Sequence, residues 1–314
     1  MDFGGTRFGA AFWVNQTGWP ELRDAALAAE AAGWDSVWLD DHLLCDEGDD
    51  LDPKLEGWTA LAALASLTSR VRLGHLVTAV TFRNLGVIAK MATTLDHVSE
   101  GRFVLGLGGG WHAREHEAFG IDFGSSFGER LDRLDEAAGL LRRLLDGEVV
   151  THHGRFYDLD RAVCAPRPLQ ARLPILIGGT GRTKTLRTVA RVADIWNAYA
   201  PPEELAELEE VLAAHGDAVG RDVGGIERQV YVNVVVRSSA AAAREAWGDV
   251  RARHAIQPGE EPLHAGGSPD EVAAALRPWV VAGVHEIVAV MRSPWDRETI
   301  ERLSEIRAAL ARPG

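Results

Sequence analysis

Cysteine and long apolar runs are scarce in this sequence, and their scarcity excludes several classes of protein. The 314 residues include only two cysteines, Cys45 and Cys164, so no framework of disulfide bonds is expected. Gly, Arg, His or Asp interrupts each apolar stretch before it reaches the roughly 20 residues that cross a bilayer. The N-terminus shows neither the basic nor the apolar segment of a signal peptide. We therefore expect a cytoplasmic protein without a membrane partner.

Positive charge is also in short supply. Asp and Glu number 46 against 33 Lys and Arg, which leaves a formal net charge of −13 at pH 7. A polyanion would meet a repulsive field over most of such a surface, so a nucleic-acid partner is not expected. The hydrophobic fraction of 46% and charged fraction of 25% are typical of a globular protein with a sizeable core.

Short apolar or β-branched runs alternate with longer segments of helical periodicity, a pattern typical of β–α units that feed a parallel sheet. No linker rich in Ser, Gly or Pro divides the chain, so residues 1–314 are expected to form one domain. The eight predicted strands are Phe8–Val14, Ser36–His42, Val71–Thr81, Arg102–Leu107, Ile175–Ile177, Asp194–Ala198, Val230–Val236 and Glu286–Val290.

The fourth and fifth strands are far apart in the chain. An amphipathic helix, Glu129–Leu145, and an irregular segment that begins at His152 lie between them. We predict a single (β/α)8 (TIM) barrel with an insertion between strands 4 and 5. The order of elements alone also allows an open, doubly wound sheet.

In such a barrel the chemistry belongs at the C-terminal ends of the strands. The fifth strand ends in Gly178, Gly179, Thr180 and Gly181, just before a helix. Bare backbone N–H groups at a helix N-terminus can hold a phosphate, although a tight turn would also require glycine. The glycines Gly106–Gly110 after the fourth strand allow close approach of a planar ring, or simply fit a crowded rim.

The second strand ends in Asp41 and His42, a carboxylate beside the one side chain that titrates near neutral pH. We expect His42 to carry a proton and Asp41 to orient it, with a structural pair at the rim as the alternative. The acidic loop that follows, from Asp46 to Asp52, is expected to be solvated. If it overhangs the site, it would discourage anionic substrates.

The segment from His112 to His116 matches H-x-x-E-H, an inverted zinc-protease pattern. We expect no metal here, because His112 follows a glycine-rich strand end and no third ligand is evident. A solvated first helical turn, with Glu115 near the positive end of the helix dipole, is the interpretation we favour.

Several segments in order, spaced as the strands and helices require, carry a resemblance that covers most of the chain to about Tyr199. They are Ala32–His42, Leu67–Gly74, Ala89–Arg102, Gly106–Gly120, Pro174–Gly179 and Ala193–Asn197. Together they resemble the luciferase-like monooxygenase (bacterial luciferase-like) superfamily, and they match its branch dependent on the deazaflavin coenzyme F420 best.

The resemblance implies a cofactor ring at the C-terminal ends of the strands and a cis peptide near Leu76–Val77 that presses a bulge against the ring. It implies a homodimer, and phosphate held by the glycines of strand five. The cofactor-binding residues expected from the motifs and the resemblance are Leu76, Val77, Thr78, Gly110, Trp111, Gly178, Gly179, Thr180 and Gly181.

Some positions depart from the family pattern. His75 and Leu85 stand where relatives commonly carry a small or hydroxylated residue and a proline. The F420-dependent sugar-phosphate dehydrogenases carry an acidic residue and a tryptophan where this chain has Trp111 and Leu44, which argues against sugar-phosphate oxidation.

The expected activity is hydride transfer between F420 and a small organic substrate, with His42 exchanging the accompanying proton. An FMN-dependent monooxygenase that uses molecular oxygen is the alternative. A barrel that only stores or senses its cofactor, and a zinc hydrolase, are further alternatives.

Overall fold

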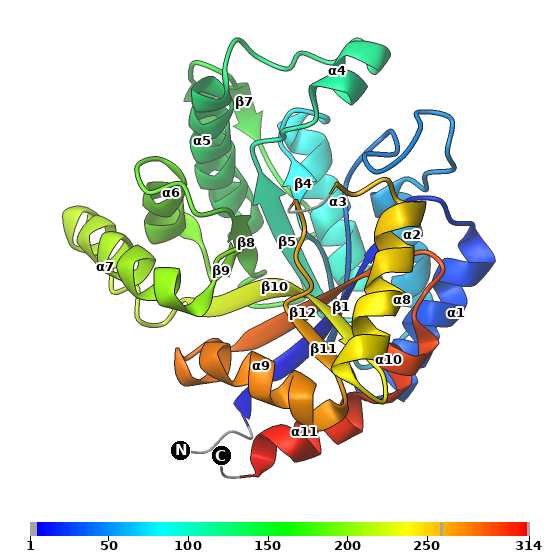
Figure 1. Cartoon of the computed structure of the whole chain (residues 1–314). Helices are drawn as coiled ribbons and strands as arrows, with labels where there is room; N and C mark the ends of the chain where they lie inside the picture. The colour runs from blue at the N-terminus through cyan, green and yellow to red at the C-terminus, as the bar shows by residue number, and fades with distance from the viewer. Residues whose placement is uncertain (1–4, 258–259, 313–314) are drawn as a thin grey trace.

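A closed barrel of parallel strands forms the centre of the protein in a computed structural model, which describes residues 5–257 and 260–312 (Figure 1). Each barrel strand pairs in parallel with the next, and pairing of β9 with β10 closes the ring. The predicted (β/α)8 barrel is therefore confirmed. Its strands are β1 (Arg7–Trp13), β2 (Ser36–Leu39), β3 (Arg72–His75), β5 (Phe103–Gly108), β8 (Ile175–Gly178), β9 (Ile195–Ala198), β10 (Glu227–Val236) and β12 (Glu286–Arg292).

The third predicted strand, Val71–Thr81, is not continuous. A cis peptide between Leu76 and Val77 interrupts it, as the family resemblance implied. The two parts are β3 and the short β4 (Thr78–Ala79), and both pair with β5. A further short strand, β11 (Ala265–Gly267), pairs with the end of β10.

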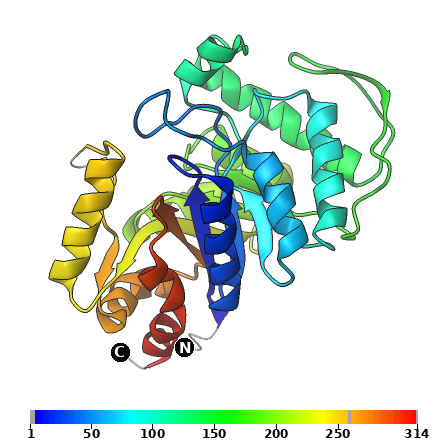
Figure 2. The ribbon, with the colours of Figure 1, turned by 90° about the vertical axis from the view of Figure 1, so that its right-hand side faces the viewer.

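Helices cover the outside of the barrel, which Figure 2 shows from the side. The predicted closing helix Arg297–Leu310 is interrupted at Arg302, whose φ of −97° and ψ of 15° leave the helical region. The helices outside the insertion are α1 (Trp19–Ala31), α2 (Gly57–Leu67), α3 (Leu85–Val98), α6 (Thr185–Val192), α7 (Pro202–Val219), α8 (Ala240–Arg253), α9 (Pro269–Val281), α10 (Arg297–Glu301) and α11 (Leu303–Ala311). No helix in the described part of the chain combines the length and the apolar character needed to span a membrane.

The insertion follows β5 and rises above the barrel rim in Figure 1. It contains α4 (Ala113–Phe119), α5 (Phe127–Leu145) and an antiparallel pair, β6 (Val150–His153) and β7 (Asp158–Ala162). Glu136 on α5 accepts hydrogen bonds from the backbone N–H groups of Phe156 and Tyr157 and from Nε2 of His152. This one carboxylate fastens the hairpin to the helix. Helix α5 itself packs against β5, whereas β6 and β7 form a two-stranded sheet separate from the barrel.

Two main apolar cores hold the fold together, beside a small third cluster of Val235, Ala243 and Trp247. The larger lies between the strands and the surrounding helices, and the smaller fills the barrel around Trp38, Leu176 and Val288. Below the smaller core, Trp38 Nε1 donates to Ser36, which donates to Glu286. Gln229 donates to the other oxygen of Glu286 and accepts from Asn197. Because these buried groups bond one another, the barrel floor carries its polar atoms at little cost.

Candidate active site

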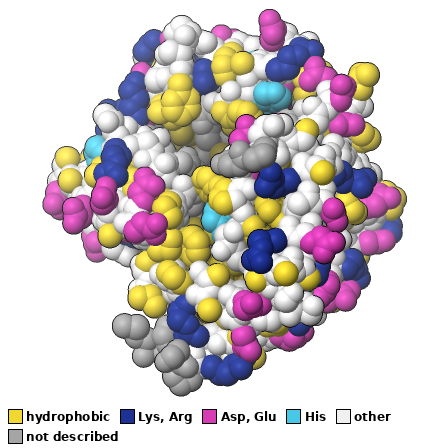
Figure 3. Space-filling view, in the orientation of Figure 1, with side chains coloured by type: hydrophobic (Ala, Val, Ile, Leu, Met, Phe, Trp, Pro, Cys, Tyr) yellow, Lys and Arg dark blue, Asp and Glu magenta, His cyan; other side chains and the backbone are white. Residues whose placement is uncertain are grey.

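A cavity of about 1090 Å³ opens at the C-terminal ends of the barrel strands, and Figure 3 shows this face of the molecule hollowed. All but one of the residues predicted to form the site line it. Thr78 is the exception, because its side chain is buried where β4 pairs with β5. The predicted site residues that line the cavity are Asp41, His42, Leu76, Val77, Gly110, Trp111, Gly178, Gly179, Thr180 and Gly181.

Glycines around the Leu76–Val77 bulge leave room for it. A Cβ added to Gly106 would lie 2.0 Å from the carbonyl oxygen of His75, and one added to Gly108 would lie 2.4 Å from a methyl group of Val77. At Gly178 the added Cβ would meet another Val77 methyl group at 3.1 Å. A crowded rim therefore accounts for Gly106 and Gly108, and their absent side chains let Val77 face the cavity.

The loop from Gly178 to Gly181 fits both interpretations made from the sequence, a tight turn and a phosphate site. Gly179 adopts a φ of +120° and its N–H donates to the carbonyl of Asn197, so a tight turn does require glycine there. Thr180 and Gly181 donate no backbone hydrogen bond to any described residue. Helix α6 begins four residues after Gly181 and has no side-chain cap, and Thr180, Gly181 and Thr185 all line the cavity.

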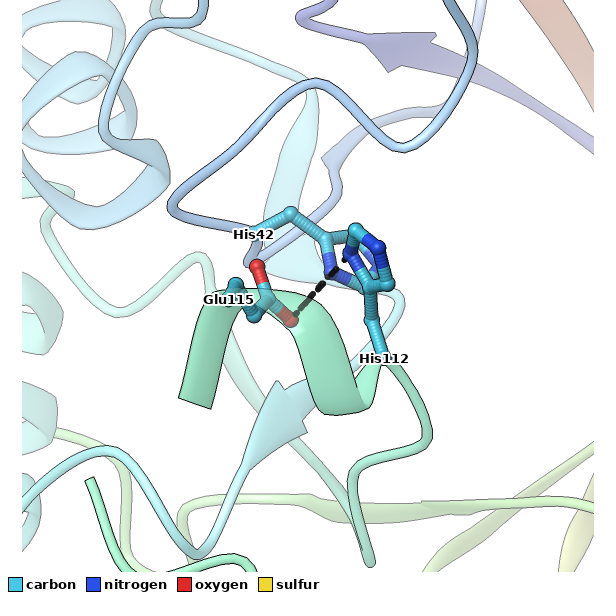
Figure 4. A group of neighbouring side chains, drawn as sticks. All are labelled: His42, His112 and Glu115. Carbon is cyan, nitrogen blue, oxygen red and sulfur yellow. Dashed lines mark hydrogen bonds and ion pairs between the residues drawn. The ribbon is translucent and has the colours of Figure 1, made fainter. Parts of the chain in front are cut away.

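His42 is held by Glu115, which sequence reasoning did not place in the site (Figure 4). Nδ1 of His42 donates to Oε1 of Glu115 at 2.8 Å, and the backbone N–H of Leu43 donates to Oε2 at 2.7 Å. Burial opposes a charge on His42, but the hydrogen bond to Glu115 and the charges of Asp46 and Asp40 outweigh it and raise the pKa of His42. Burial tends to raise the pKa of Glu115, but His42 and the Leu43 N–H keep that pKa below its usual value.

The expected pairing of Asp41 with His42 is wrong. Asp41 receives two hydrogen bonds from the guanidinium of Arg83, at 2.7 and 2.9 Å, and one from the backbone N–H of Ala79. Arg83 also donates to Glu56 at 2.7 Å. Adjacent residues at a strand end point in different directions, so Asp41 turns toward the bulge while His42 turns toward α4.

The H-x-x-E-H segment is not a solvated turn, because Glu115 and His116 are both buried. His116 Nδ1 donates to the carbonyl of His112, and its Nε2 lies 2.7 Å from the hydroxyl of Thr81. Burial lowers the pKa of His116, so this ring is a neutral structural group beneath the rim.

The premise that the segment lacks a third metal ligand is also wrong. Ligand atoms of His42, His112 and Glu115 lie within 4.8 Å of one another, so two imidazoles and a carboxylate are close enough to hold one ion. The histidine that joins this group is His42 from another strand, whereas His116 points away toward Thr81. In the described structure the Glu115 oxygens are already engaged by His42 and Leu43.

Part of the acidic loop overhangs the cavity. Asp46, Glu47 and Gly48 line it, whereas Asp49 and Asp50 are exposed as predicted. On the opposite side, aromatic side chains of Trp13, Tyr199 and Tyr231 complete the wall. Periodicity could not single them out, because apolar and aromatic residues at strand ends are far more often simple core residues.

Comparison with known proteins identifies the family. A sequence profile of the luciferase-like monooxygenase family matches residues 6–275. The chain therefore belongs to the luciferase-like monooxygenase family, a family of oxidoreductases, as its motifs predicted.

Several curated relatives are named F420-dependent enzymes. A glucose-6-phosphate dehydrogenase of this type from Microbacterium testaceum is 36% identical over 68% of this chain and 63% of its own length. Its counterpart from Nakamurella multipartita is 32% identical over 88% and 83%, respectively. A hydroxymycolic acid dehydrogenase from Mycobacterium tuberculosis is 31% identical over 83% and 72%. The chain thus spans less than two thirds of the first relative and more of the others.

Solved structures agree on the fold. An F420-dependent secondary alcohol dehydrogenase in complex with an F420–acetone adduct superposes with a TM-score of 0.83 at 20% identity, covering 97% of this chain and 99% of that one. The monooxygenase RslO1 from Streptomyces bottropensis superposes with a TM-score of 0.79 at 21% identity, covering 98% of each chain. At identities this low, the superpositions support the barrel fold, and the reaction has to be argued from the residues of the site.

Proposed function

We propose that the protein transfers a hydride between coenzyme F420 and a small organic substrate inside the barrel cavity. The observation that carries the proposal is that Val77 lines the same cavity as Thr180 and Gly181, whose amides donate to no described residue. Relatives over most of the chain are named F420-dependent dehydrogenases, which favours F420 over FMN.

The residues present fit such a cofactor. A volume of about 1090 Å³ exceeds that of most small-molecule pockets, roughly 300–1,000 Å³, so a tricyclic ring and a substrate fit together. Val77 offers the ring an apolar support, and the free N–H groups of Thr180 and Gly181 offer its phosphate donors. When bound, the deazaflavin supplies a carbon that accepts or donates a hydride.

His42 exchanges the proton that accompanies the hydride, and Glu115 fixes the orientation of its ring. The raised pKa of His42 keeps a proton available near neutral pH, where general acid–base catalysis is most effective. Asp41 anchors the backbone of Ala79 and the Arg83 side chain, so we assign it to holding the bulge in place. Homodimer formation and a cytoplasmic location stay predictions.

Side-by-side titration tests the cofactor. We expect F420 to bind at least tenfold more tightly than FMN, as measured by the fluorescence of each cofactor. Replacing Gly181 with Ala places a Cβ 2.8 Å from the Thr185 hydroxyl and should weaken F420 binding about tenfold or more, because the loop must shift. Gly225→Ala, which meets no atom within 4 Å, is the matched control. Tighter binding of FMN, with oxygen uptake in the presence of a reductant, would favour the monooxygenase instead.

A further inference from the structure

The cavity wall carries negative charge, and among its described residues the protonated form of His42 is already paired with Glu115. Among the described residues that line it, seven are Asp or Glu and none is Lys or Arg. The seven are Asp40, Asp41, Asp46, Glu47, Glu115, Glu260 and Glu261. An anion that entered from solvent would therefore meet carboxylates before any fixed positive charge.

The nearby cations lie behind these carboxylates. Lys54 forms an ion pair with Asp40 and lies 3.4 Å from Asp46, and its side chain is only 5% exposed. Arg83 is held by Asp41 in the same way. These pairs neutralise part of the wall, but they leave no ammonium or guanidinium group free to receive a substrate.

Arg292, at the end of β12, is the clearest case of a cation that carboxylates already occupy. Its side chain is fully buried, and its Nε donates to both oxygens of Glu47 at 2.9 and 2.8 Å. Nη2 pairs with Glu261, and Nη1 donates to Asn233 at 3.1 Å. Two carboxylates share one guanidinium, so the group as a whole stays negative and Arg292 is unavailable to a ligand.

An aromatic wall stands beside this group. Tyr199 and Tyr231 stack with ring centroids 4.7 Å apart, and Trp13 meets Tyr231 edge-on at 6.3 Å. Tyr231 lies on β10, opposite β3 in the barrel order, whereas Tyr199 follows β9, which pairs with β8. Burial, with the charge of Glu261, raises the pKa of Tyr231, so its hydroxyl remains neutral. The space between the bulge and this wall is thus faced by rings and carboxylates.

We infer that the substrate carries no negative charge, that its body packs against Trp13, Tyr199 and Tyr231, and that phosphate esters and carboxylates are excluded. The inference rests on the proposed function, because the cofactor ring would cover the bulge and its phosphate would take the free amides of Thr180 and Gly181. Those amides are the part of the cavity suited to an anion. The chain therefore differs in substrate from its relatives named glucose-6-phosphate dehydrogenases.

Collisional quenching of bound F420 fluorescence tests the inference without a known substrate. Iodide is the anionic probe and acrylamide the neutral one, each normalised to its quenching of free F420. We expect acrylamide to reach the ring and iodide to quench about tenfold less, because the carboxylates lower the local concentration of anions. Equal quenching by both probes would overturn the inference. Absence of quenching by acrylamide would also overturn it, because no space for a substrate would then lie beside the ring.

A double variant, Glu47→Gln/Glu261→Gln, removes both carboxylates from Arg292. Iodide quenching should then rise several-fold. The control Glu210→Gln/Glu245→Gln removes the same charge from exposed positions on α7 and α8 and should leave quenching unchanged. An equal rise in the control would show that net charge, not this cluster, governs anion entry, and would overturn the assignment.

Substrate turnover by the wild-type protein is a second test, and its result does not depend on whether the double variant folds. The wild-type protein with F420 should not oxidise glucose 6-phosphate, and measurable reduction of F420 by that compound would overturn the inference. Absence of F420 binding would refute the proposed function itself. F420 binding combined with oxidation of a sugar phosphate would refute only the substrate class.

Discussion

Glu115 accepts a hydrogen bond from His42 at 2.8 Å across 73 residues of sequence. The contact joins the end of β2 to the first turn of α4, so the inserted segment supplies the group that orients the proposed proton carrier. Because Oε2 of Glu115 also accepts a hydrogen bond from the Leu43 N–H, both carboxylate oxygens are held in place. The His42 ring consequently has one preferred orientation toward the cavity.

Replacing Glu115 with Gln should lower the pKa of His42 by about one unit or more, because an opposite charge at hydrogen-bond distance is lost. An NMR titration of the His42 ring would show this shift, and the pH profile of turnover should move in the same direction. Glu117→Gln, at an exposed position of the same helix, is the control. An unchanged His42 titration in Glu115→Gln would contradict the assigned role.

The same pair should also make stability depend on pH. The pKa of His42 is raised in the folded protein, so the stabilisation is fully present below the unfolded value of about 6.5 and is lost as pH rises through the folded pKa. The difference in unfolding free energy between wild type and Glu115→Gln should therefore be largest near pH 6 and shrink above neutrality. Urea unfolding at several pH values measures it. A difference that grows with pH would reverse the sign and refute the coupling.

His42→Ala should reduce turnover by about 10²–10⁴-fold, the usual contribution of a general acid–base group, while F420 binding changes little. Fluorescence titration separates the two effects. Single-turnover oxidation of an uncharged alcohol found active in a substrate screen would measure the chemical step. Full activity of His42→Ala would remove this residue from the mechanism.

Asp41→Asn should act on stability rather than on the titration of His42. The substitution disrupts the paired hydrogen bonds between Asp41 and Arg83. Of the two carboxylates that Arg83 contacts, Glu56 then remains. Loss of one partner from such a buried pair costs about 3 kcal/mol, which urea denaturation would detect as a lower midpoint. The exposed Asp249→Asn on α8 serves as control. A large shift in the His42 pKa with stability intact would restore the direct pairing expected from the sequence.

Removal of metal ions should leave F420 binding and turnover unchanged, despite the convergence of His42, His112 and Glu115. Nδ1 of His42 lies 2.8 Å from Glu115, whereas two ligands on one tetrahedral zinc stand roughly 3.4 Å apart. The hydrogen-bonded pair would have to separate to admit an ion. Dialysis against EDTA followed by both assays checks this. Loss of activity that zinc restores would show that the cluster is a metal centre.

Local pattern was sufficient to place the strands, whereas the choice of a closed barrel over an open, doubly wound sheet also needed the motifs and the family resemblance. All eight barrel strands were predicted in order because alternating apolar runs and helical periodicity reflect how each segment buries one face. The glycines at the ends of β5 and β8 were predicted to lie on the rim, since a backbone with φ near +120°, as at Gly179 just after β8, restricts the residue type wherever the rest of the chain goes.

Only the tertiary structure decided which side chains meet above that scaffold. Sequence neighbours suggested that Asp41 orients His42, yet Asp41 binds Arg83 and the partner of His42 is Glu115 from the insertion. Arg292 would pass for a free cation in the sequence, although Glu47 and Glu261 enclose it. Periodicity reports the direction of a side chain relative to its own strand or helix. Contacts between elements depend on how long loops close over the barrel, and no local pattern encodes that geometry.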